Sequence, residues 1–484
     1  MIDPMRRTKI IATAGPATNK PGMIEKLLRT GVDLFRINYS HQTHEDHERC
    51  VNRIREVSAK LGIEVGIIAD LQGPKIRLGQ FRDGSVMLRE GEKFILDGAL
   101  TSKAGTRKKV GFTYKKLPKD VKPGDTLLLD DGRIVLEVLD VKTGRIGCRV
   151  KVGGELSGNK GINILGGGLS AESLTAKDKK DLAHASRMGV DYFAVSFVRS
   201  AGDIKSTRKL IKKHNSNAGI IAKFERIEAI QNARSIIKAS DAIMIARGDL
   251  GVEMGDAALP PIQKNLIRQA REMDRAVITA TQMMESMIEN QIPLRAEVFD
   301  VANAVLDGTD AVMLSGETSI GLYPDKVVAA MARICEETEK QRVTRISDHR
   351  INQRFHKIEE AIAMATMYTA NHIGAKAIAA LTETGSTCMW MSRISSGIPI
   401  YAFTRNLTTF RKARLYRGVY PVLFDITHTD PLEANQEIIE NLLKKHAVSN
   451  GDLVIITKGD LRGKRGGTNN MKIVRVGKVQ DRTV

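Results

Sequence analysis

The sequence predicts an α/β protein: a (β/α)8 barrel of the TIM type, with an all-β insertion after the third strand and a second α/β domain toward the C-terminus. Three observations support this prediction. From Thr8 onward, short apolar runs alternate with amphipathic helical patterns, which is typical of parallel strand-helix units. Eight such units follow one another, and eight is the number that closes a barrel. One long β-like stretch interrupts the series, and a polar, Arg-rich connector at residues 341–356 ends it.

The expected barrel elements are short apolar strands, each followed by a helical pattern with one apolar face. The strands are Lys9–Thr13, Leu34–Asn38, Gly66–Asp70, Tyr192–Ser196, Gly219–Lys223, Ala242–Ile245, Ala276–Thr279 and Ala311–Leu314. The helices are Met23–Arg29, Thr43–Leu61, Lys177–Met188, Asp203–Lys213, Ile227–Lys238, Ile262–Met273, Glu297–Leu306 and Pro324–Glu339. The helix of the third strand comes only after the insertion.

Two further regions complete the expected organisation, in which residues 1–71 and 167–345 form the barrel. Residues 72–166 form the insertion, with short strands at Val86–Leu88, Lys93–Leu96, Thr126–Leu129, Ile134–Val138 and Arg145–Val150. Residues 346–484 form the C-terminal domain, with a helix at Ile358–Ile373 and strands at Ala377–Leu381, Ile400–Phe403, Val419–Val422, Leu453–Thr457 and Ile473–Val476. An insertion after the third strand lies at the C-terminal mouth of the barrel, where it is expected to act as a lid.

Composition narrows the function classes. The chain has 484 residues and a formal net charge of +19, which attracts nucleic acids or small polyanions. Aromatic residues make up only 4%, and no basic arm is interleaved with them, so a nucleic-acid platform is disfavoured. No apolar run reaches about 18 residues, so we expect a cytoplasmic protein without a membrane span. The four cysteines are far apart, which predicts reduced thiols.

Charged residues stand where two buried strands are expected to end. Lys223 and Glu225 follow one apolar run, and Arg247 and Asp249 follow the next. Two carboxylates on adjacent strand ends can hold a Mg2+ ion and leave other positions for water and phosphate, while a lysine adds a mobile positive charge. Each short motif alone would also fit a solvated strand end. In a barrel, however, all strand C-termini face one side, so such residues should converge.

Several strand ends carry longer motifs in a fixed order. They are Phe35-Arg-Ile-Asn-Tyr-Ser-His41, Asp70-Leu-Gln-Gly-Pro-Lys-Ile-Arg77, Ile221-Ala-Lys-Phe-Glu225, Met244-Ile-Ala-Arg-Gly-Asp-Leu-Gly251, Thr279-Ala-Thr-Gln-Met283 and Met313-Leu-Ser-Gly-Glu-Thr318. In these motifs and their spacing the sequence resembles the pyruvate kinase family over nearly the whole chain. The resemblance implies phosphoryl transfer from phosphoenolpyruvate to ADP, giving pyruvate and ATP. It also implies an assembly of four copies of the chain.

The resemblance also implies a role for each strand-end residue. Lys223 would neutralise the charge of the migrating phosphoryl group, and Arg36 would bind the same group. Glu225 and Asp249 would hold Mg2+, with Mn2+ as a substitute. The N–H groups of Gly248 and Asp249 would receive the substrate carboxylate. Thr281 would stand beside the proton source, with Ser315 and Glu317 extending a relay through water. A serine before Gly-Glu is equally expected as a helix N-cap. The residues implied in nucleotide binding are Asn38, His41, Arg77 and Lys160.

One departure from the family pattern concerns potassium. Many members hold a monovalent cation with counterparts of Asn38, Ser40 and Asp70, together with a Thr and a Glu. Here those last two positions are Leu71 and Lys75, and Leu78 replaces another frequent Thr. An ammonium group tethered on the loop would supply the charge that potassium provides elsewhere. We therefore expect activity that does not require potassium.

The C-terminal domain carries a Gly/Ser/Thr turn between a strand and a helix. In the family this segment resembles the loop that binds an effector phosphate, which implies effector contacts from Thr382, Thr384, Gly385, Ser386 and Thr387, faced by residues 463–468. Hydroxyls and free N–H groups at a helix start suit a phosphate, although such a turn is often only a cap. Glu383 stands where bisphosphate-activated relatives often carry Lys, which favours a sugar monophosphate or AMP.

Two other function classes stay open at this point. One is a basic nucleic-acid-binding protein on a barrel scaffold, which salt-sensitive binding to DNA or RNA would reveal. The other is a Mg2+-dependent barrel lyase acting on pyruvate-like acids, which would cleave a carbon-carbon bond without ADP. His44 and His47, which stand near two glutamates, are expected to start and cap a surface helix rather than to bind a metal.

Overall fold

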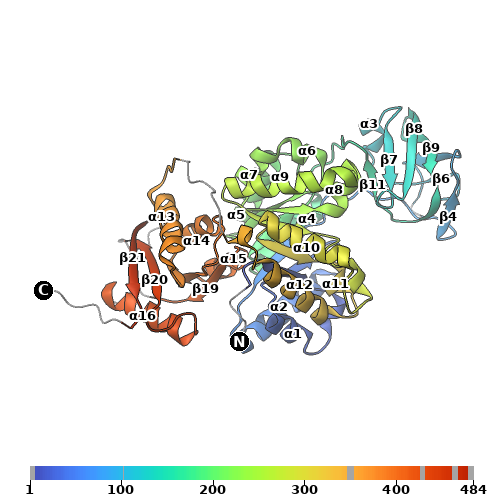
Figure 1. Ribbon diagram of the computed structural model, residues 1–484. Coiled ribbons are helices and arrows are strands. Elements are labelled where there is room, and N and C mark those ends of the chain that lie inside the picture. Colours follow the sequence, from blue (N-terminus) through green and yellow to red (C-terminus); the bar gives the residue numbers. More distant parts are fainter. Residues whose placement is uncertain (1–5, 102, 346–353, 426–430, 460–466, 478–484) are drawn as a thin grey trace.

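The computed structural model describes residues 6–101, 103–345, 354–425, 431–459 and 467–477. Three parts lie in a row, with the insertion at one end, the barrel in the middle and the C-terminal domain at the other end (Figure 1). The residues just before β1 (Lys9–Thr13) contact the C-terminal domain, since the N–H of Gly418 donates to the carbonyl oxygen of Arg7 at 3.0 Å.

Eight parallel strands close the barrel, in the order β1-β16-β15-β14-β13-β12-β3-β2. Their bounds are β1 (Lys9–Thr13), β2 (Leu34–Asn38), β3 (Gly66–Asp70), β12 (Tyr192–Val195), β13 (Gly219–Phe224), β14 (Ala242–Ala246), β15 (Ala276–Ala280) and β16 (Ala311–Leu314). The predicted fold class is confirmed, and each observed strand agrees with its expected position to within one residue at the C-terminal end.

The barrel helices depart from the expected pattern in three places: the break within 227–239, the additional helix over Arg247–Met254 and the additional short helix over Gly316–Ser319. They are α1 (Met23–Thr30), α2 (His44–Leu61), α4 (Ala176–Arg187), α5 (Ala201–Lys213), α6 (Ile227–Gln231), α7 (Ala233–Ala239), α8 (Arg247–Met254), α9 (Leu259–Glu272), α10 (Arg295–Asp307), α11 (Gly316–Ser319) and α12 (Pro324–Thr338). The single helix expected over 227–238 is broken at Asn232, because its side chain donates to the carbonyl oxygens of Arg199 and Glu228. Helix α8 was not expected, since two glycines give its sequence low helix propensity.

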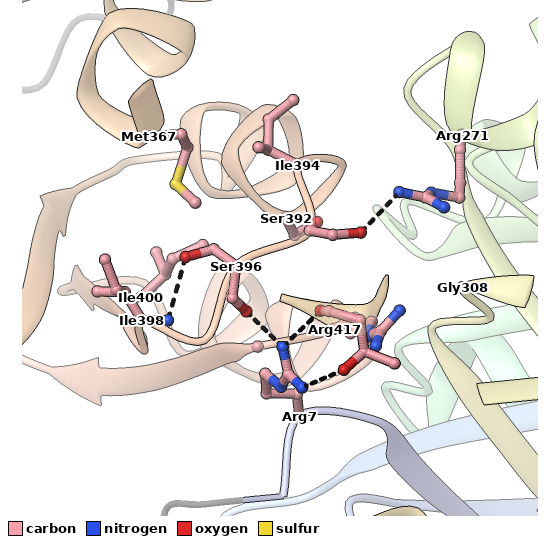
Figure 2. A pocket seen from close by; sticks show the side chains of 13 residues that line it. Arg7, Arg271, Gly308, Met367, Ser392, Ile394, Ser396, Ile398, Ile400 and Arg417 are labelled. Atoms are coloured by element: carbon pink, nitrogen blue, oxygen red, sulfur yellow. Dashed lines mark hydrogen bonds between the residues drawn. The ribbon is translucent and has the colours of Figure 1, made fainter. Parts of the chain in front are cut away.

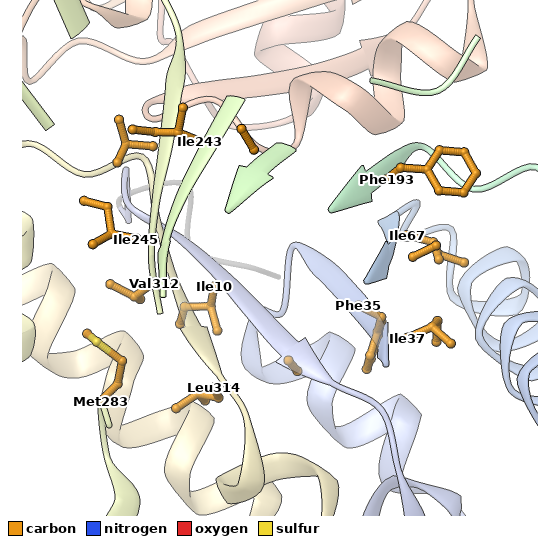
Figure 3. Packing of buried hydrophobic residues seen from close by; sticks show 14 of the residues in the cluster. Ile10, Phe35, Ile37, Ile67, Phe193, Ile243, Ile245, Met283, Val312 and Leu314 are labelled. Carbon is orange, nitrogen blue, oxygen red and sulfur yellow. The ribbon is translucent and has the colours of Figure 1, made fainter. Parts of the chain in front are cut away.

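Successive side chains of each barrel strand point to opposite faces, so one set packs in the apolar core and the other lines the candidate site. In β2, Phe35 and Ile37 are fully or nearly fully buried and belong to the apolar shell between strands and helices, where Figure 3 shows them pointing toward the helices. Because successive strand residues point to opposite faces, Arg36 and Asn38 point into the barrel. The same two-residue alternation places Lys223 on the inner face of β13, the face to which Ile221 also points.

The insertion is all β apart from α3 (Leu117–Asp120). Its six-stranded sheet has the order β11-β7-β8-β9-β5-β6, and β10 pairs with β4 in a separate two-stranded sheet. The strands are β4 (Ser85–Leu88), β5 (Lys93–Asp97), β6 (Lys109–Val110), β7 (Thr126–Leu129), β8 (Ile134–Lys142), β9 (Arg145–Val152), β10 (Gly154–Ser157) and β11 (Ile162–Ile164). The three short strands β6, β10 and β11 were not expected from the sequence.

The C-terminal domain is a five-stranded sheet in the order β19-β18-β17-β20-β21, flanked by helices. The strands are β17 (Ala377–Leu381), β18 (Ile400–Thr404), β19 (Val419–Leu423), β20 (Leu453–Gly459) and β21 (Thr468–Arg475); the helices are α13 (Ile358–Ile373), α14 (Ser386–Ser392), α15 (Leu407–Ala413) and α16 (Pro431–Lys444). The edge strand β21 begins five residues before the expected Ile473, since its first three residues, Thr468, Asn469 and Asn470, are polar rather than apolar. Among the described residues, no helix is long and apolar enough to cross a membrane.

Candidate active site

Lys223 lies at the centre of a buried ionic network at the C-terminal ends of neighbouring barrel strands. Its Nζ is 2.7 Å from Glu225 Oε1 and 3.2 Å from Asp70 Oδ1, and it donates to Ser196 Oγ at 2.8 Å. Ser196 in turn donates to the carbonyl oxygen of Leu71 at 2.8 Å. One ammonium group is thus held by two carboxylates and a hydroxyl.

A second cation enters the network from β2. Arg36 Nε donates to Asp70 Oδ2 at 2.6 Å, and Nη1 donates to Thr13 Oγ1 at 3.2 Å. Asp70 therefore binds Arg36 with one oxygen and Lys223 with the other. The two cations are held on either side of a single carboxylate, which keeps two positive side chains together at one end of the barrel.

The pKa values of the network follow from burial and from these neighbours. Burial lowers the pKa of Lys223, but Asp70 and Glu225 outweigh it and raise the pKa above its usual value. Burial raises the pKa of Asp70, but Lys223 and Arg36 outweigh it and hold the pKa below the usual range. The pKa of Glu225 is raised by burial, and the nearby Asp249 adds to this, while Lys223 opposes it. Glu225 and Asp249 thus lie close enough to repel each other.

Asp249 lies in the first turn of α8, directly after β14. Its Oδ1 is 3.7 Å from Nζ of Lys75, which comes from the loop after β3. Both residues border a pocket whose wall also includes Gly161 of the insertion. Glu225 and Asp249 are the only proposed metal ligands here, and no group of three or more His, Cys, Asp or Glu in the described ranges could hold a metal.

The turn after β15 is held against α8. Thr281 and Gln282 both have positive φ, and Thr281 Oγ1 accepts the N–H of Gly248 at 2.9 Å. The buried Arg247 donates to the carbonyl oxygens of Thr281 and Gln282 and pairs with Asp300 at 2.7 Å. These contacts stabilise a backbone conformation that non-glycine residues adopt rarely. They also occupy the N–H of Gly248.

Ser315 and Glu317 lie together after β16. Ser315 occupies the N-cap position of α11, but its side chain makes no capping hydrogen bond, and its buried Oγ has no hydrogen-bond partner among the residues that the structure describes. Glu317 accepts N–H groups from Ser315 at 2.6 Å and from Met284 at 3.2 Å. Burial raises the pKa of Glu317, although these backbone donors oppose it.

The residues expected at the nucleotide are only partly brought together. Burial lowers the pKa of His41, and the positive charges of Arg77, Arg36 and Lys75 lower it further. These three cations therefore lie near one histidine. Asn38 Oδ1 accepts the N–H of Ser40 at 3.1 Å within the same loop. Arg77 donates to the carbonyl oxygen of Asn159 at 2.9 Å, at the base of the insertion. Lys160 instead pairs with Asp130 of the insertion at 2.8 Å and borders a different pocket.

Two groups at this site were not assigned a role from the sequence. Ser196 was expected only as the last residue of a strand, yet its hydroxyl binds Lys223. Glu253, in α8, accepts the N–H of Ile227 at 3.1 Å and borders the pocket beside Asp249, and burial raises its pKa to about 7. Ser196 stood outside the quoted motifs and Glu253 stood two residues after one of them, so only the tertiary arrangement shows that both belong to the site.

Comparison with known proteins decides the family. A profile described as "Pyruvate kinase, barrel domain" matches residues 5–328, and one described as "Pyruvate kinase, alpha/beta domain" matches residues 360–474. The chain belongs to the pyruvate kinase family. It is 52% identical over 480 residues to "Pyruvate kinase" of Buchnera aphidicola subsp. Schizaphis graminum, covering 98% of this chain and 100% of that relative.

Two further relatives agree. The chain is 53% identical over 476 residues to "Pyruvate kinase II" of Salmonella typhimurium, covering 98% of this chain and 99% of the relative. It is 52% identical over 460 residues to "Pyruvate kinase" of Haemophilus influenzae, covering 94% and 96%. The predicted resemblance to pyruvate kinase is confirmed, and the chain is a phosphotransferase.

In this pyruvate kinase chain, the loop before α14 is cross-linked by its own polar groups. Thr382 Oγ1 accepts the N–H of Gly385 at 2.9 Å, and Thr384 and Ser386 share a hydrogen bond of 2.7 Å. Thr387 Oγ1 contacts Thr468 Oγ1 at 2.9 Å, so the start of β21 does face the helix. Residues 463–466, also expected here, lie outside the described residues. Glu383 pairs with Arg405 at 3.2 Å.

The histidines of α2 differ from the expectation. Thr43, not a histidine, caps the helix, accepting the N–H of Asp46, because a hydroxyl reaches that donor where an imidazole does not. His47 is only 1% exposed and packs against Tyr39, so it belongs to the protein interior rather than to the surface.

Proposed function

We propose that the chain transfers the phosphoryl group of phosphoenolpyruvate to ADP, giving pyruvate and ATP, as a step of glycolysis in the cytoplasm. The observation that carries the proposal is the network of Lys223, Arg36 and Asp70, which holds two cations at one end of a barrel. Phosphoryl transfer passes through a loose, anionic transition state, so it needs positioning and charge neutralisation more than covalent help. Family membership favours this reaction over the nucleic-acid and lyase alternatives.

Glu225 and Asp249 are suited to hold Mg2+, or Mn2+ in its place. Two neighbouring carboxylates repel each other, which is consistent with the raised pKa of Glu225, and a divalent cation would relieve that repulsion. Mg2+ is usually bound by one or two carboxylates together with substrate oxygens, so two ligands from the protein suffice. When bound, the ion would supply positive charge for substrate oxygens and for the enolate.

The side chains of the chain itself would do the remaining work. Lys223 would neutralise the migrating phosphoryl group, and Arg36 would hold the same group from β2. The start of α8, at Gly248 and Asp249, would receive the substrate carboxylate; for Gly248 this requires its N–H to leave Thr281 Oγ1, to which it donates here. Asn38, His41, Arg77 and Lys160 would meet the nucleotide; for Lys160 this requires release from Asp130, with which it pairs here.

Protonation of the enolate would take place beside Thr281. Its hydroxyl accepts the N–H of Gly248 and donates to the carbonyl oxygen of Ala280 at 2.6 Å, so its orientation is fixed. Ser315 and Glu317 would extend a proton relay through water. The partnerless Oγ of Ser315 and the raised pKa of Glu317 support this assignment.

We propose that catalysis does not require potassium. The region of Asn38, Ser40 and Asp70 would use the ammonium group of Lys75 in place of a bound ion. The side chain of Lys75 reaches Asp249, one of the two proposed Mg2+ ligands, which places its positive charge inside the site. A fixed charge at this position makes a second, mobile cation unnecessary.

Two features outside the site support regulation and assembly. The hydroxyls of Thr382, Thr384, Ser386 and Thr387 together with Gly385 would bind the phosphate of an effector such as a sugar monophosphate or AMP, in a regulatory domain spanning 346–484. The insertion at 72–166 would act as the lid of the barrel formed by 1–71 and 167–345. A homotetramer would cover the exposed apolar side chains of Ile292, Leu294, Phe299, Ile320 and Leu322.

The test is ADP-dependent release of pyruvate by the wild type and by Lys223→Met. We expect the variant to lose about three orders of magnitude in kcat, because it removes the charge aimed at the transferring group. Lys177→Met is the matched control, since Lys177 lies near the same end of the barrel and donates to the carbonyl oxygen of Tyr39 and to Asp181 rather than to the network of Lys223. Equal rates for Lys223→Met and wild type would refute the proposed role of Lys223.

A further inference from the structure

A second cationic pocket lies between the barrel and the C-terminal domain, at the opposite end of the barrel strands from the candidate active site. It has about 350 Å³ of empty space, including its open mouth, and Arg7, Arg271 and Arg417 line it. Figure 2 shows the three arginines on one side of this pocket and Met367, Ile394, Ile398 and Ile400 on the other. Three guanidinium groups from separate elements therefore meet in one place.

Arg7 is fully engaged by the protein. It donates to the carbonyl oxygen of Thr344 at 2.7 Å and to that of Ser396 at 2.5 Å, and its Nε is 3.5 Å from Glu339. Its position is thus fixed by contacts that join the barrel to the following domain. Arg7 adds charge to the pocket without offering free donors.

Arg417 and Arg271 are different. Arg417 is only 8% exposed, and its Nη2 has no hydrogen-bond partner in the described part of the chain. Arg271 reaches the carbonyl oxygen of Arg393 at 3.1 Å and Ser395 Oγ at 3.2 Å, both through Nη2. Neither arginine forms an ion pair within the described ranges. Burying a guanidinium group without a partner is costly, so a free donor here points to an absent acceptor.

Two carboxylates beside the pocket, Glu339 and Asp310, already have cationic partners, and Glu339 pairs with Arg7. Both oxygens of Asp310 bind the guanidinium group of Arg393, and Asp310 also accepts the N–H of Arg417 at 3.0 Å. Burial, together with the charges of Arg417 and Arg393, lowers the pKa of Arg271 to about 10, and Asp310 only partly opposes this. The pocket therefore has an excess of positive charge in a partly desolvated position.

The backbone beside Arg271 leaves room for its guanidinium group at Gly308. Gly308 has φ of +91°, and a Cβ atom there would lie 2.4 Å from Arg271 Nη1. Only glycine lets the guanidinium group lie so close to the chain. Hydroxyl groups of Ser392, Ser395 and Ser396 complete the polar side of the pocket.

We propose that this pocket binds a phosphate-sized oxyanion, either inorganic phosphate or the phosphoryl group of a small metabolite, through Arg271 and Arg417. A tetrahedral oxyanion suits two guanidinium groups and neighbouring hydroxyls, because it accepts several charge-assisted hydrogen bonds at once. The site is separate from the loop at 382–387, since α14 begins at Ser386 and only its last residue, Ser392, lines the pocket. The ligand joins side chains of the barrel to side chains of the C-terminal domain.

The test measures binding of inorganic phosphate to the full-length protein at constant ionic strength, so it does not depend on the proposed reaction. Fluorescence of Trp390, the single tryptophan, reports from α14, and the melting temperature gives a second readout. We expect saturable binding to wild type that is about tenfold weaker in Arg417→Gln and in Arg271→Gln. Arg417→Lys should restore part of it. Ser386→Ala, which changes the separate phosphate site proposed at 382–387, should leave the arginine-dependent part of the binding in place.

The melting temperatures separate lost binding from a damaged fold. Without phosphate, Arg417→Gln should melt at or above the wild type, because it removes one of several crowded cations; with phosphate, the order should reverse. If Arg417→Gln melts far lower in both buffers, Arg271→Gln decides by the same comparison. Glycerol 3-phosphate in a parallel titration distinguishes the sources: tighter binding than phosphate indicates a metabolite, and equal binding indicates the free anion. No saturable binding to wild type, unchanged binding in both arginine variants, or loss in Ser386→Ala alone would overturn the proposal.

Discussion

Arg393, in the C-terminal domain, forms a buried two-point ion pair with Asp310, which precedes barrel strand β16. Arg393 Nη1 lies 2.8 Å from Asp310 Oδ2, and Nη2 contacts Oδ1. The side chains are 1% and 0% exposed, so neither charge has access to solvent. The pair connects the two parts of the chain at the end of the barrel that lies away from the candidate active site.

Removing one partner of this pair should destabilise the protein strongly. Arg393→Met leaves Asp310 buried without its counter-charge, which costs about 3 to 5 kcal/mol. Urea unfolding measures the change. The control is Glu337→Gln, which breaks the exposed pair with Lys340 and should cost less than about 1 kcal/mol. Similar decreases in the free energy of unfolding for the two variants would contradict the proposed contribution of the buried pair to stability.

The buried His47 should make stability fall at acidic pH. Burial lowers the pKa of His47 to about 4, and the charges of His184 and His44 contribute. An unfolded chain protonates this group near pH 6.5, so between about pH 6.5 and 4 the unfolded state binds the extra proton. The free energy of unfolding should then drop by up to about 1.4 kcal/mol per pH unit.

His47→Gln should flatten this part of the pH dependence. The measurement is the urea midpoint from pH 7.5 to 4.5 for both proteins. His214→Gln, which changes an exposed histidine, serves as the control and should keep the wild-type slope. An identical slope in His47→Gln would show that other groups cause the acid sensitivity.

Potassium should have little effect on the rate of the wild type. The ammonium group of Lys75 lies 3.7 Å from Asp249 Oδ1 and supplies a fixed charge there. Lys75→Glu should lower activity in potassium-free buffer, because it replaces that charge with a negative one. The assay is a potassium titration of pyruvate release for both proteins. Strong activation of the wild type, or an unchanged rate of the variant without potassium, would contradict the tethered-charge explanation.

Phe299 should contribute to the contact between copies of the chain. It is 71% exposed on α10, and Ile292 and Ile320 nearby are 76% and 63% exposed. The two flanking segments adjoin, since the N–H of Leu322 donates to the carbonyl oxygen of Ile288 at 2.8 Å. Phe299→Glu places a charge among these exposed apolar side chains and should reduce the proposed homotetramer to smaller species, as measured by analytical ultracentrifugation. Leu423→Glu, an exposed apolar residue of the other domain, is the comparison.

The sequence predicted the fold and the strand-end residues because both depend on local pattern. Arg36, Asp70 and Lys223 each stand at a fixed place relative to an apolar run, and the closure of the barrel brings such places together. The arginine pocket carries no comparable signal. Arg271 and Arg417 stand in different domains, 146 positions apart, outside any motif, and their meeting depends on how the domains pack. The same applies to Lys160, whose pairing with Asp130 is set by the fold of the insertion.

Asp70 should determine the alkaline limit of activity. Burial alone would lower the pKa of Lys223, and the charges of Asp70 and Glu225 reverse this. In Asp70→Asn one of these charges is lost, so Lys223 should give up its proton at a lower pH, with a shift of about 1 to 3 units. Because the proposed role of Lys223 requires its charge, the alkaline limb of the profile of kcat/KM against pH should move to lower pH by that amount, while the acidic limb stays in place. Asp203→Asn, which changes a carboxylate that accepts the N–H of Ser200 at the start of α5, should leave both limbs unchanged. If the alkaline limb of Asp70→Asn coincides with that of the wild type, one of two explanations holds. Either Glu225 alone keeps Lys223 charged, or the charge of Lys223 does not limit the reaction. The pH profile of Glu225→Gln distinguishes these two cases.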